Sequence, residues 1–152
     1  MKSVYRIGQH YRIVFKLNQD LFAKELKVKT IGIAFCVGLS EEAEKTEEIL
    51  SRHFKVVSVC CKVTGTNKKD YKLKQIDPAK EEVMCNPAIQ AELLNDAQTE
   101  LNVVIGLCVG HDSIFYMTSK APVTTFITKD RVLAHNPAAA LYCHYIRDNF
   151  ET

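Results

Sequence analysis

Four short apolar runs alternate with segments of helical pattern along the chain. They lie at residues 31–37, 55–63, 101–109 and 123–128, and β-branched residues are frequent in them. Short runs that are apolar almost throughout are typical of strands covered on both faces of a sheet. Strands that alternate with helices at this spacing predict a parallel sheet wound with helices by right-handed crossovers.

Capping residues and prolines mark where the helices begin. Ser40 is a suitable N-cap for a helix between the first two strands. The dipeptides Asn86-Pro87 and Asn136-Pro137 predict the starts of two further helices, the second of which runs through Ile146. We also expect a short helix at 112–117 and an imperfect amphipathic helix at 16–27.

The predicted fold class is α/β, with three layers and a mainly parallel sheet of four strands, of the Rossmann-like or flavodoxin-like kind. The strand order 2-1-3-4 is expected because it puts the first helix on one face and the later helices on the other. It also creates a switch point between the first and third strands, where ligands bind in open sheets of this type. We expect a single domain over residues 1–152, with an N-terminal helical extension at 1–28 and a core at 29–150.

Size and charge restrict the class of protein. A chain of 152 residues, 47% hydrophobic and 25% charged, suits one globular domain. The first 29 residues hold seven Lys/Arg and two Asp/Glu, but they lack interleaved aromatics, so we expect no nucleic-acid partner. No apolar run approaches twenty residues and the start lacks signal-peptide features, so we expect a cytoplasmic protein without a membrane partner.

Cysteines carry the strongest chemical signal. In a reducing cytosol, six cysteines favour metal binding or thiol chemistry over disulfides. The tripeptide Cys-Val-Gly occurs at 36–38 and again at 108–110, each time at the end of a predicted strand. These strands are neighbours in the expected order, so Cys36 and Cys108 are expected roughly 5 Å apart if their registers match.

Further metal-capable side chains are expected at the same edge. Cys85 and His135 each precede an Asn-Pro helix start, Cys61 lies at the end of the second strand, and His111 lies just after the second Cys-Val-Gly. Thiolate and imidazole ligands select zinc or an iron–sulfur cluster. The alternative for each cysteine is an inert place in the core, which we expect for Cys60 and Cys143. The predicted ligand candidates are Cys36, Cys61, Cys85, Cys108, His111 and His135.

Longer blocks of sequence carry a resemblance to a known family. These blocks are IGIAFCVGL, the dipeptide CK at 61–62, MCNPAIQAELLN, TELNVVIGLCVGHDSIF and APVTTFITKDRVLAHNPAAALY. In them the chain resembles a prokaryotic family of unknown function whose members are described as uncharacterised metal-binding proteins. The resemblance implies a cytosolic protein that binds metal through cysteines, and Cys36, Cys61, Cys85 and Cys108 match its blocks. Family members usually carry a separate N-terminal cysteine-rich segment, and this chain has no cysteine before Ile31.

Two other functions fit the same residues. Cys108 or Cys36 at a strand-to-helix turn is suited to act as the nucleophile of a metal-free thiol enzyme, with His111 as base. Alternatively, the Cys-Val-Gly turns and Asn-Pro helix starts present free amides to a small anionic molecule. The sequence leaves open whether the protein is an enzyme, which metal it holds and its oligomeric state.

Overall fold

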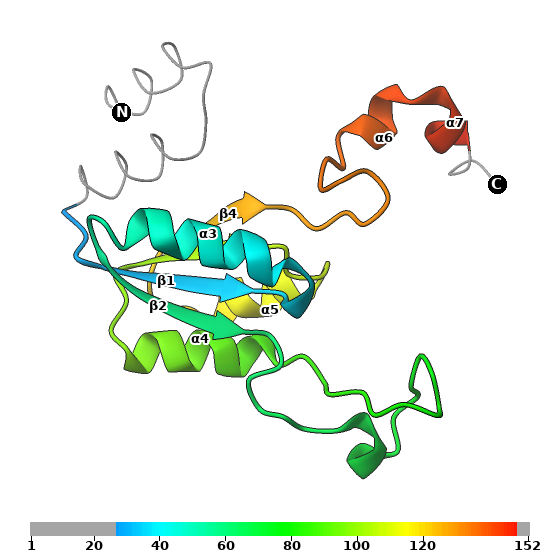
Figure 1. Cartoon of the computed structure of the whole chain (residues 1–152), viewed down its shortest axis with the longest axis horizontal. Helices are drawn as coiled ribbons and strands as arrows, with labels where there is room; N and C mark the ends of the chain where they lie inside the picture. Colours follow the sequence, from blue (N-terminus) through cyan, green and yellow to red (C-terminus); the bar gives the residue numbers. More distant parts are fainter. Residues whose placement is uncertain (1–26, 149–152) are drawn as a thin grey trace.

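Within residues 27–148, the sheet is built from four parallel strands, and Figure 1 shows helices alongside it. The computed structural model describes residues 27–148, so the helix predicted at 16–27 lies outside the described residues except for Lys27, which is in a turn. The sheet has the order β2-β1-β3-β4, as the sequence predicts. Its strands are β1 (Thr30–Phe35), β2 (Lys55–Cys60), β3 (Leu101–Ile105) and β4 (Val123–Ile127).

Three strands end level with one another at the carboxyl edge. Phe35 of β1 is opposite Cys60 of β2 and Ile105 of β3. The strands predicted from the sequence extend too far at this edge, because the chain leaves the sheet in turns. After Cys36 it enters a 3₁₀ turn, η1 (Val37–Leu39), and after β3 it passes through Gly106 at φ 62°. The turns start at the same level, so their side chains gather at one edge.

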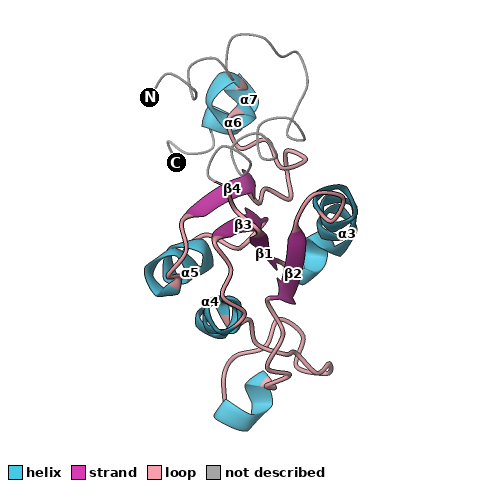
Figure 2. Cartoon of the chain, turned by 90° about the vertical axis from the view of Figure 1, so that its left-hand side faces the viewer, coloured by secondary structure: helices cyan, strands magenta, loops and turns pink. Residues whose placement is uncertain are grey.

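Helices cover both faces of the sheet, which confirms the three-layer α/β/α prediction (Figure 2). Helix α3 (Ser40–Leu50) packs on one face, and α4 (Pro87–Asp96) and α5 (His111–Thr118) pack on the other. All five residues of β3 are buried, as expected for a central strand between two helical layers. Apolar burial in these layers is the main stabilising contribution to the fold.

Between β2 and α4 the chain forms a protruding arm at residues 62–84, which contains the short 3₁₀ helix η2 (Lys68–Tyr71). An antiparallel bridge joins Asn67 to Val83, and Met84 N–H donates to the carbonyl of Thr66 at 2.8 Å. The two ends of the arm are therefore held together. This fixes the point at which the chain re-enters the sheet edge.

The C-terminal segment differs from the prediction of one helix opened by Asn136 and Pro137. Two four-residue helices are present instead, α6 (Ala139–Tyr142) and α7 (His144–Arg147). They are separated by Cys143, whose backbone is extended (φ −86°, ψ 112°). The segment stands away from the sheet (Figure 1) and Leu141 is 67% exposed, so little apolar burial favours a longer helix.

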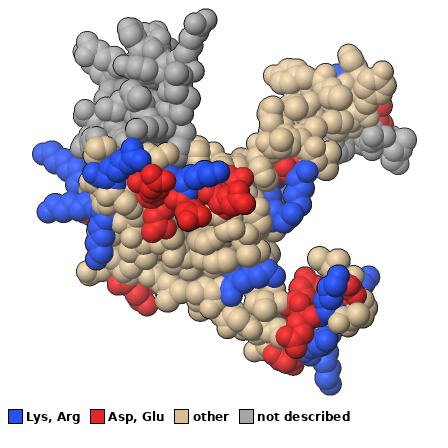
Figure 3. Space-filling view, viewed as in Figure 1, with Lys and Arg blue, Asp and Glu red and all other residues tan. Residues whose placement is uncertain are grey.

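The surface in Figure 3 mixes charges of both signs. Acidic side chains gather over α3, where Glu41 and Glu42 occupy the first helical turn, and lysines and acids are interspersed on the arm. Acidic residues at a helix N-terminus are stabilised by the helix dipole. Within residues 27–148, no helix has both the length and the apolar character needed to cross a membrane.

Candidate functional site

Four cysteines from four separate segments meet at the carboxyl edge of the sheet. Cys36 directly follows β1, Cys61 directly follows β2, Cys85 lies just before α4, and Cys108 lies three residues beyond β3. The Cys85 thiol donates a hydrogen bond to the Cys61 sulfur at 3.5 Å. Cys61 in turn hydrogen-bonds to Cys36. The structure thus brings together all four cysteines that the sequence analysis placed at this edge.

Lys129 links the fourth cysteine to the other three. Its ammonium nitrogen lies 2.8 Å from the Cys36 sulfur and 3.2 Å from the Cys108 sulfur. Because both sulfurs contact the same nitrogen, they are no more than about 6 Å apart. We define the thiol cluster as Cys36, Cys61, Cys85 and Cys108, with Lys129 as its cation.

Cys36 carries the negative charge of the cluster. The hydrogen bond from Cys61 lowers the pKa of Cys36 to about 4, against the effect of burial and with help from Lys129 and Gly38. The contribution of Gly38 is its backbone N–H, which lies 3.5 Å from the Cys36 sulfur at the start of η1. Hydrogen bonds and a cation directed at a sulfur stabilise its thiolate form.

Cys61 keeps its proton. Its contact with Cys36 raises the pKa of Cys61 above the usual range, and burial acts in the same direction. Burial alone would lower the pKa of Lys129, but its hydrogen bonds to Cys36 and Cys108 raise it. The cluster therefore pairs one thiolate with one ammonium group, which offsets part of the penalty of burying either charge.

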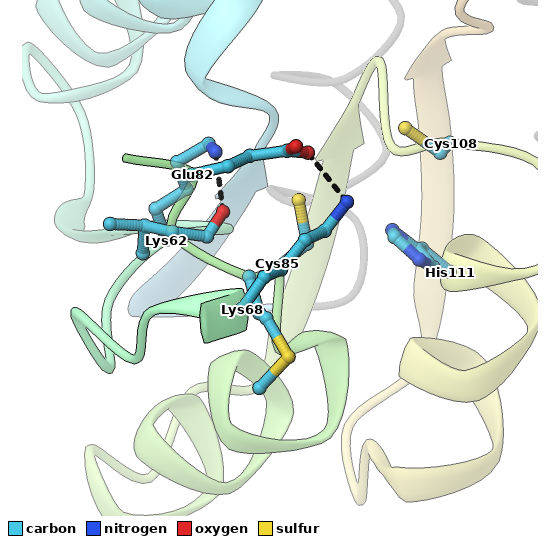
Figure 4. Close-up of a pocket in the computed structure, with 8 residues that line it drawn as sticks. Lys62, Lys68, Glu82, Cys85, Cys108 and His111 are labelled. Atoms are coloured by element: carbon cyan, nitrogen blue, oxygen red, sulfur yellow. Dashed lines mark hydrogen bonds and ion pairs between the residues drawn. The ribbon is translucent and has the colours of Figure 1, made fainter. Parts of the chain in front are cut away.

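A cavity of about 380 Å³ opens beside the cluster (Figure 4). It lies between the arm and the start of α5, with Cys108 and His111 on the side opposite Lys62. Lys68 forms an ion pair with Glu82 at 2.6 Å, and the Lys62 ammonium donates to the carbonyl of Val83 at 2.6 Å. The lining residues are Lys62, Lys68, Glu82, Val83, Met84, Cys85, Cys108 and His111.

The two histidines predicted as ligands have different surroundings. The His111 side chain lines the cavity with Cys108, and its backbone N–H donates to the Cys108 carbonyl at 2.9 Å. His135 lies in the loop after β4, where its Nδ1 accepts a hydrogen bond from the backbone N–H of Asp130 at 3.1 Å. The structure therefore brings His111 to the cavity, but it does not include His135 among the lining residues.

As the side chains stand, the donors do not form a finished metal site. Within residues 27–148, no group of three or more His, Cys, Asp or Glu side chains is arranged to hold a metal ion. Lys129 lies between Cys36 and Cys108 instead. None of the six cysteines, all of which lie in the described part of the chain, forms a disulfide.

Lys129 and the charged side chains of the cavity were not among the site residues predicted from the sequence. Lys129 lies two residues after the end of β4, and strand ends of a parallel sheet share one edge, so its position was a usable signal. Lys62 follows Cys61 directly and carried a similar signal. Lys68 and Glu82 reach the cavity through the fold of the arm, which no local pattern predicts.

Comparisons with known proteins confirm the resemblance to a family of unknown function, but they do not mention metal binding. Residues 8–126, more than half of the chain, match the family described as "Protein of unknown function (DUF1847)". The "Uncharacterized protein MJ0455" of Methanocaldococcus jannaschii is 56% identical over 144 residues, which cover 94% of this chain and 75% of that protein. No solved structure matches the chain significantly. These descriptions name no ligand and no reaction. The chain belongs to the DUF1847 family of proteins of unknown function.

Proposed function

We propose that this protein binds a soft metal centre, either zinc or an iron–sulfur cluster, through Cys36, Cys61, Cys85 and Cys108. The observation that carries the proposal is that thiols from four chain segments gather at one edge: Cys85, Cys61 and Cys36 are in consecutive contact, and Lys129 joins Cys36 to Cys108. A single nucleophile needs only one thiol, whereas four thiolates are the usual ligands of structural zinc and of iron–sulfur clusters. The donor chemistry thus favours a soft metal over calcium or magnesium.

Distances within the cluster support the fit in part. With Zn–S bonds of about 2.3 Å, the sulfurs of a tetrahedral site are about 3.8 Å apart. The sulfurs of Cys61 and Cys85 are already 3.5 Å apart. Cys36 and Cys108 are held apart by Lys129, so binding requires this lysine to withdraw. Its flexible stem allows that movement, and its charge would then offset part of the negative charge of the bound thiolates.

The proposal is tested by metal analysis of protein purified without oxygen. We expect close to one equivalent of zinc, or iron with acid-labile sulfide and visible absorption. Substitution of Cys61 or Cys85 by serine should lower metal content at least tenfold, because removal of one of four ligands opens the site. Two matched controls, Cys60→Ser and Cys143→Ser, should retain the metal. Cys60 is next to Cys61 in the sequence. Less than about a tenth of an equivalent in the unsubstituted protein would contradict the proposal.

A second candidate function is supported by the contact between Lys129 and Cys36. An ammonium group 2.8 Å from a sulfur is suited to keep that sulfur as a nucleophilic thiolate without any metal. Metal analysis and thiol alkylation of the same oxygen-free preparation distinguish the two functions. Negligible metal, together with alkylation of Cys36 at neutral pH faster than that of Cys143, favours thiol chemistry. Thiols protected until a chelator is added favour metal binding.

A further inference from the structure

We propose that Cys61 and Cys85 form a redox-active dithiol, which small anionic disulfides entering the cavity oxidise to an intramolecular disulfide. This activity goes beyond metal binding and requires no metal. It rests on the contact between two sulfurs and on the cavity that reaches one of them.

The two cysteines are already placed for bond formation. Their sulfurs are 3.5 Å apart, and the backbone N–H of Asn86 donates to the carbonyl of Cys61 at 2.8 Å. A disulfide has an S–S bond of about 2.0 Å, so the sulfurs must approach by about 1.5 Å. Side-chain rotation is able to supply this while the backbone hydrogen bond holds the two segments together.

Accessibility decides which sulfur reacts first. Cys85 lines the cavity, whereas Cys61 is 2% exposed. Cys36 also contacts Cys61, but it is 4% exposed and does not line the cavity. Cys108 also lines the cavity, but among the described residues its sulfur contacts the ammonium of Lys129 and not a second thiol, so it lacks a partner to resolve a mixed disulfide. Cys85 is therefore the entry point, and Cys61 is the thiol that resolves the intermediate.

The reaction balances with the disulfide R–S–S–R as oxidant. Cys85 loses its proton to water, and its sulfur attacks one sulfur of R–S–S–R, which breaks the S–S bond and releases RS⁻. Cys61 then passes its proton to the Cys36 thiolate, to which it is hydrogen-bonded, and its sulfur attacks the Cys85 sulfur of the mixed disulfide, which releases a second RS⁻. Cys36 afterwards releases this proton to water. Both RS⁻ groups take up protons. Two protein thiols are oxidised to one disulfide, and one R–S–S–R is reduced to two RSH.

Charge around the cavity favours an anionic oxidant. The cavity is lined by two lysines, Lys62 and Lys68, and one glutamate, Glu82. The formal charge of these side chains is therefore +1, without His111. Glu82 is ion-paired with Lys68, whereas the contact of the Lys62 ammonium is a neutral carbonyl. A positively charged cavity raises the local concentration of anions and disfavours cations. Disulfides that bear carboxylates should therefore react faster than those that bear amines.

The test uses the full chain, reduced and treated with chelator. It is mixed with dithiodipropionate, an anionic disulfide, or with cystamine, a cationic one, and then acid-quenched for peptide mapping by mass spectrometry. We expect a disulfide that joins the Cys61 and Cys85 peptides. After normalisation to a free-thiol reference compound, dithiodipropionate should react about fivefold faster than cystamine.

Variants separate the roles of the two sulfurs. Cys61→Ser should accumulate a mixed disulfide on Cys85, while Cys85→Ser should lose the fast reaction and Cys143→Ser should leave it unchanged. First modification at Cys108, a Cys36–Cys61 disulfide, or equal rates for the two probes would overturn the proposal. Because metal content is measured separately, failure of this test is distinguishable from failure of the metal proposal.

Discussion

At the scale of single residues, Cys36 and Lys129 determine the chemistry of the cluster. Lys129 contacts both Cys36 and Cys108, so the positive charge lies between two sulfurs from adjacent strand ends. The pKa of Cys36 is lowered to about 4, first by Cys61 and then by Lys129. Because the unfolded thiol has a pKa of about 8.5, this thiolate stabilises the native state fully above that pH. The contribution is lost as the pH falls towards about 4.

Removal of the ammonium group should make the Cys36 thiolate harder to form. Hydrogen bonds to charged groups contribute about 1.5–3 kcal/mol, so Lys129→Met should raise the pKa of Cys36 by about one to two units. Thiolate absorbance in the far ultraviolet, followed during a pH titration of the reduced and chelator-treated protein, measures this shift. Lys120→Met, which removes an exposed surface lysine, is the control. Equal midpoints for the two variants would show that Lys129 does not stabilise the thiolate.

At the scale of elements, α4 anchors the site to the sheet. The side chain of Asn86 caps its N-terminus by accepting from Ile89 N–H at 3.0 Å. One turn on, the buried Gln90 amide donates to the carbonyls of Phe35 at 3.2 Å and Val59 at 2.7 Å. These carbonyls belong to the ends of β1 and β2, directly before Cys36 and close to Cys61. Gln90 therefore fastens the helix that follows Cys85 to the strands that precede its partners.

Loss of this anchor should destabilise the fold. Gln90→Met leaves two carbonyls without their side-chain donor, so we expect the free energy of unfolding to fall by about 1–3 kcal/mol. Urea denaturation followed by circular dichroism measures this change. The exposed Glu92 lies on the same helix, and Glu92→Gln should change stability by no more than about 0.5 kcal/mol. A Gln90→Met protein as stable as the Glu92→Gln protein would contradict the anchoring role.

The elements could be predicted where the sequence pattern is local. Apolar runs identified all four strands, because a buried parallel strand requires continuous apolar residues. Their order followed from the expected distribution of the helices over the two faces. The exact ends were missed, since the turns after β1 and β3 depend on contacts such as that between Gly106 and Leu39. The last helix was predicted as one element, but Asn136 and Pro137 do not open it and Cys143 interrupts it.

The residues of the candidate site, like the elements, could be predicted where the sequence pattern is local. The four cysteines could be placed at one edge, because each lies near the end of a predicted strand or just before a predicted helix. Lys129 was missed because a lone lysine carries no motif, although its place after β4 put it at that edge. The contact between Cys61 and Cys85 depends on the arm, whose two ends pair through Asn67 and Val83. No pattern in the intervening polar segment predicts that pairing.

At the scale of the whole molecule, the winding of the chain creates the site. The reversal between β1 and β3 puts α3 on one face and α4 and α5 on the other, which leaves the strand ends free of helices. The four thiols, Lys129 and the cavity all lie at this edge. The arm forms one wall of the cavity and returns the chain at Cys85. The topology thus combines residues distant in sequence into one centre.

X-ray absorption spectroscopy of the zinc-loaded protein tests most directly whether these thiols act together as one metal centre. The account predicts a first coordination shell of four sulfurs at about 2.3 Å from zinc. Cys60→Ser should give the same spectrum, because that side chain is outside the cluster. A shell composed mainly of nitrogen or oxygen at about 2.0–2.2 Å would contradict the assignment of Cys36, Cys61, Cys85 and Cys108 as a common ligand set.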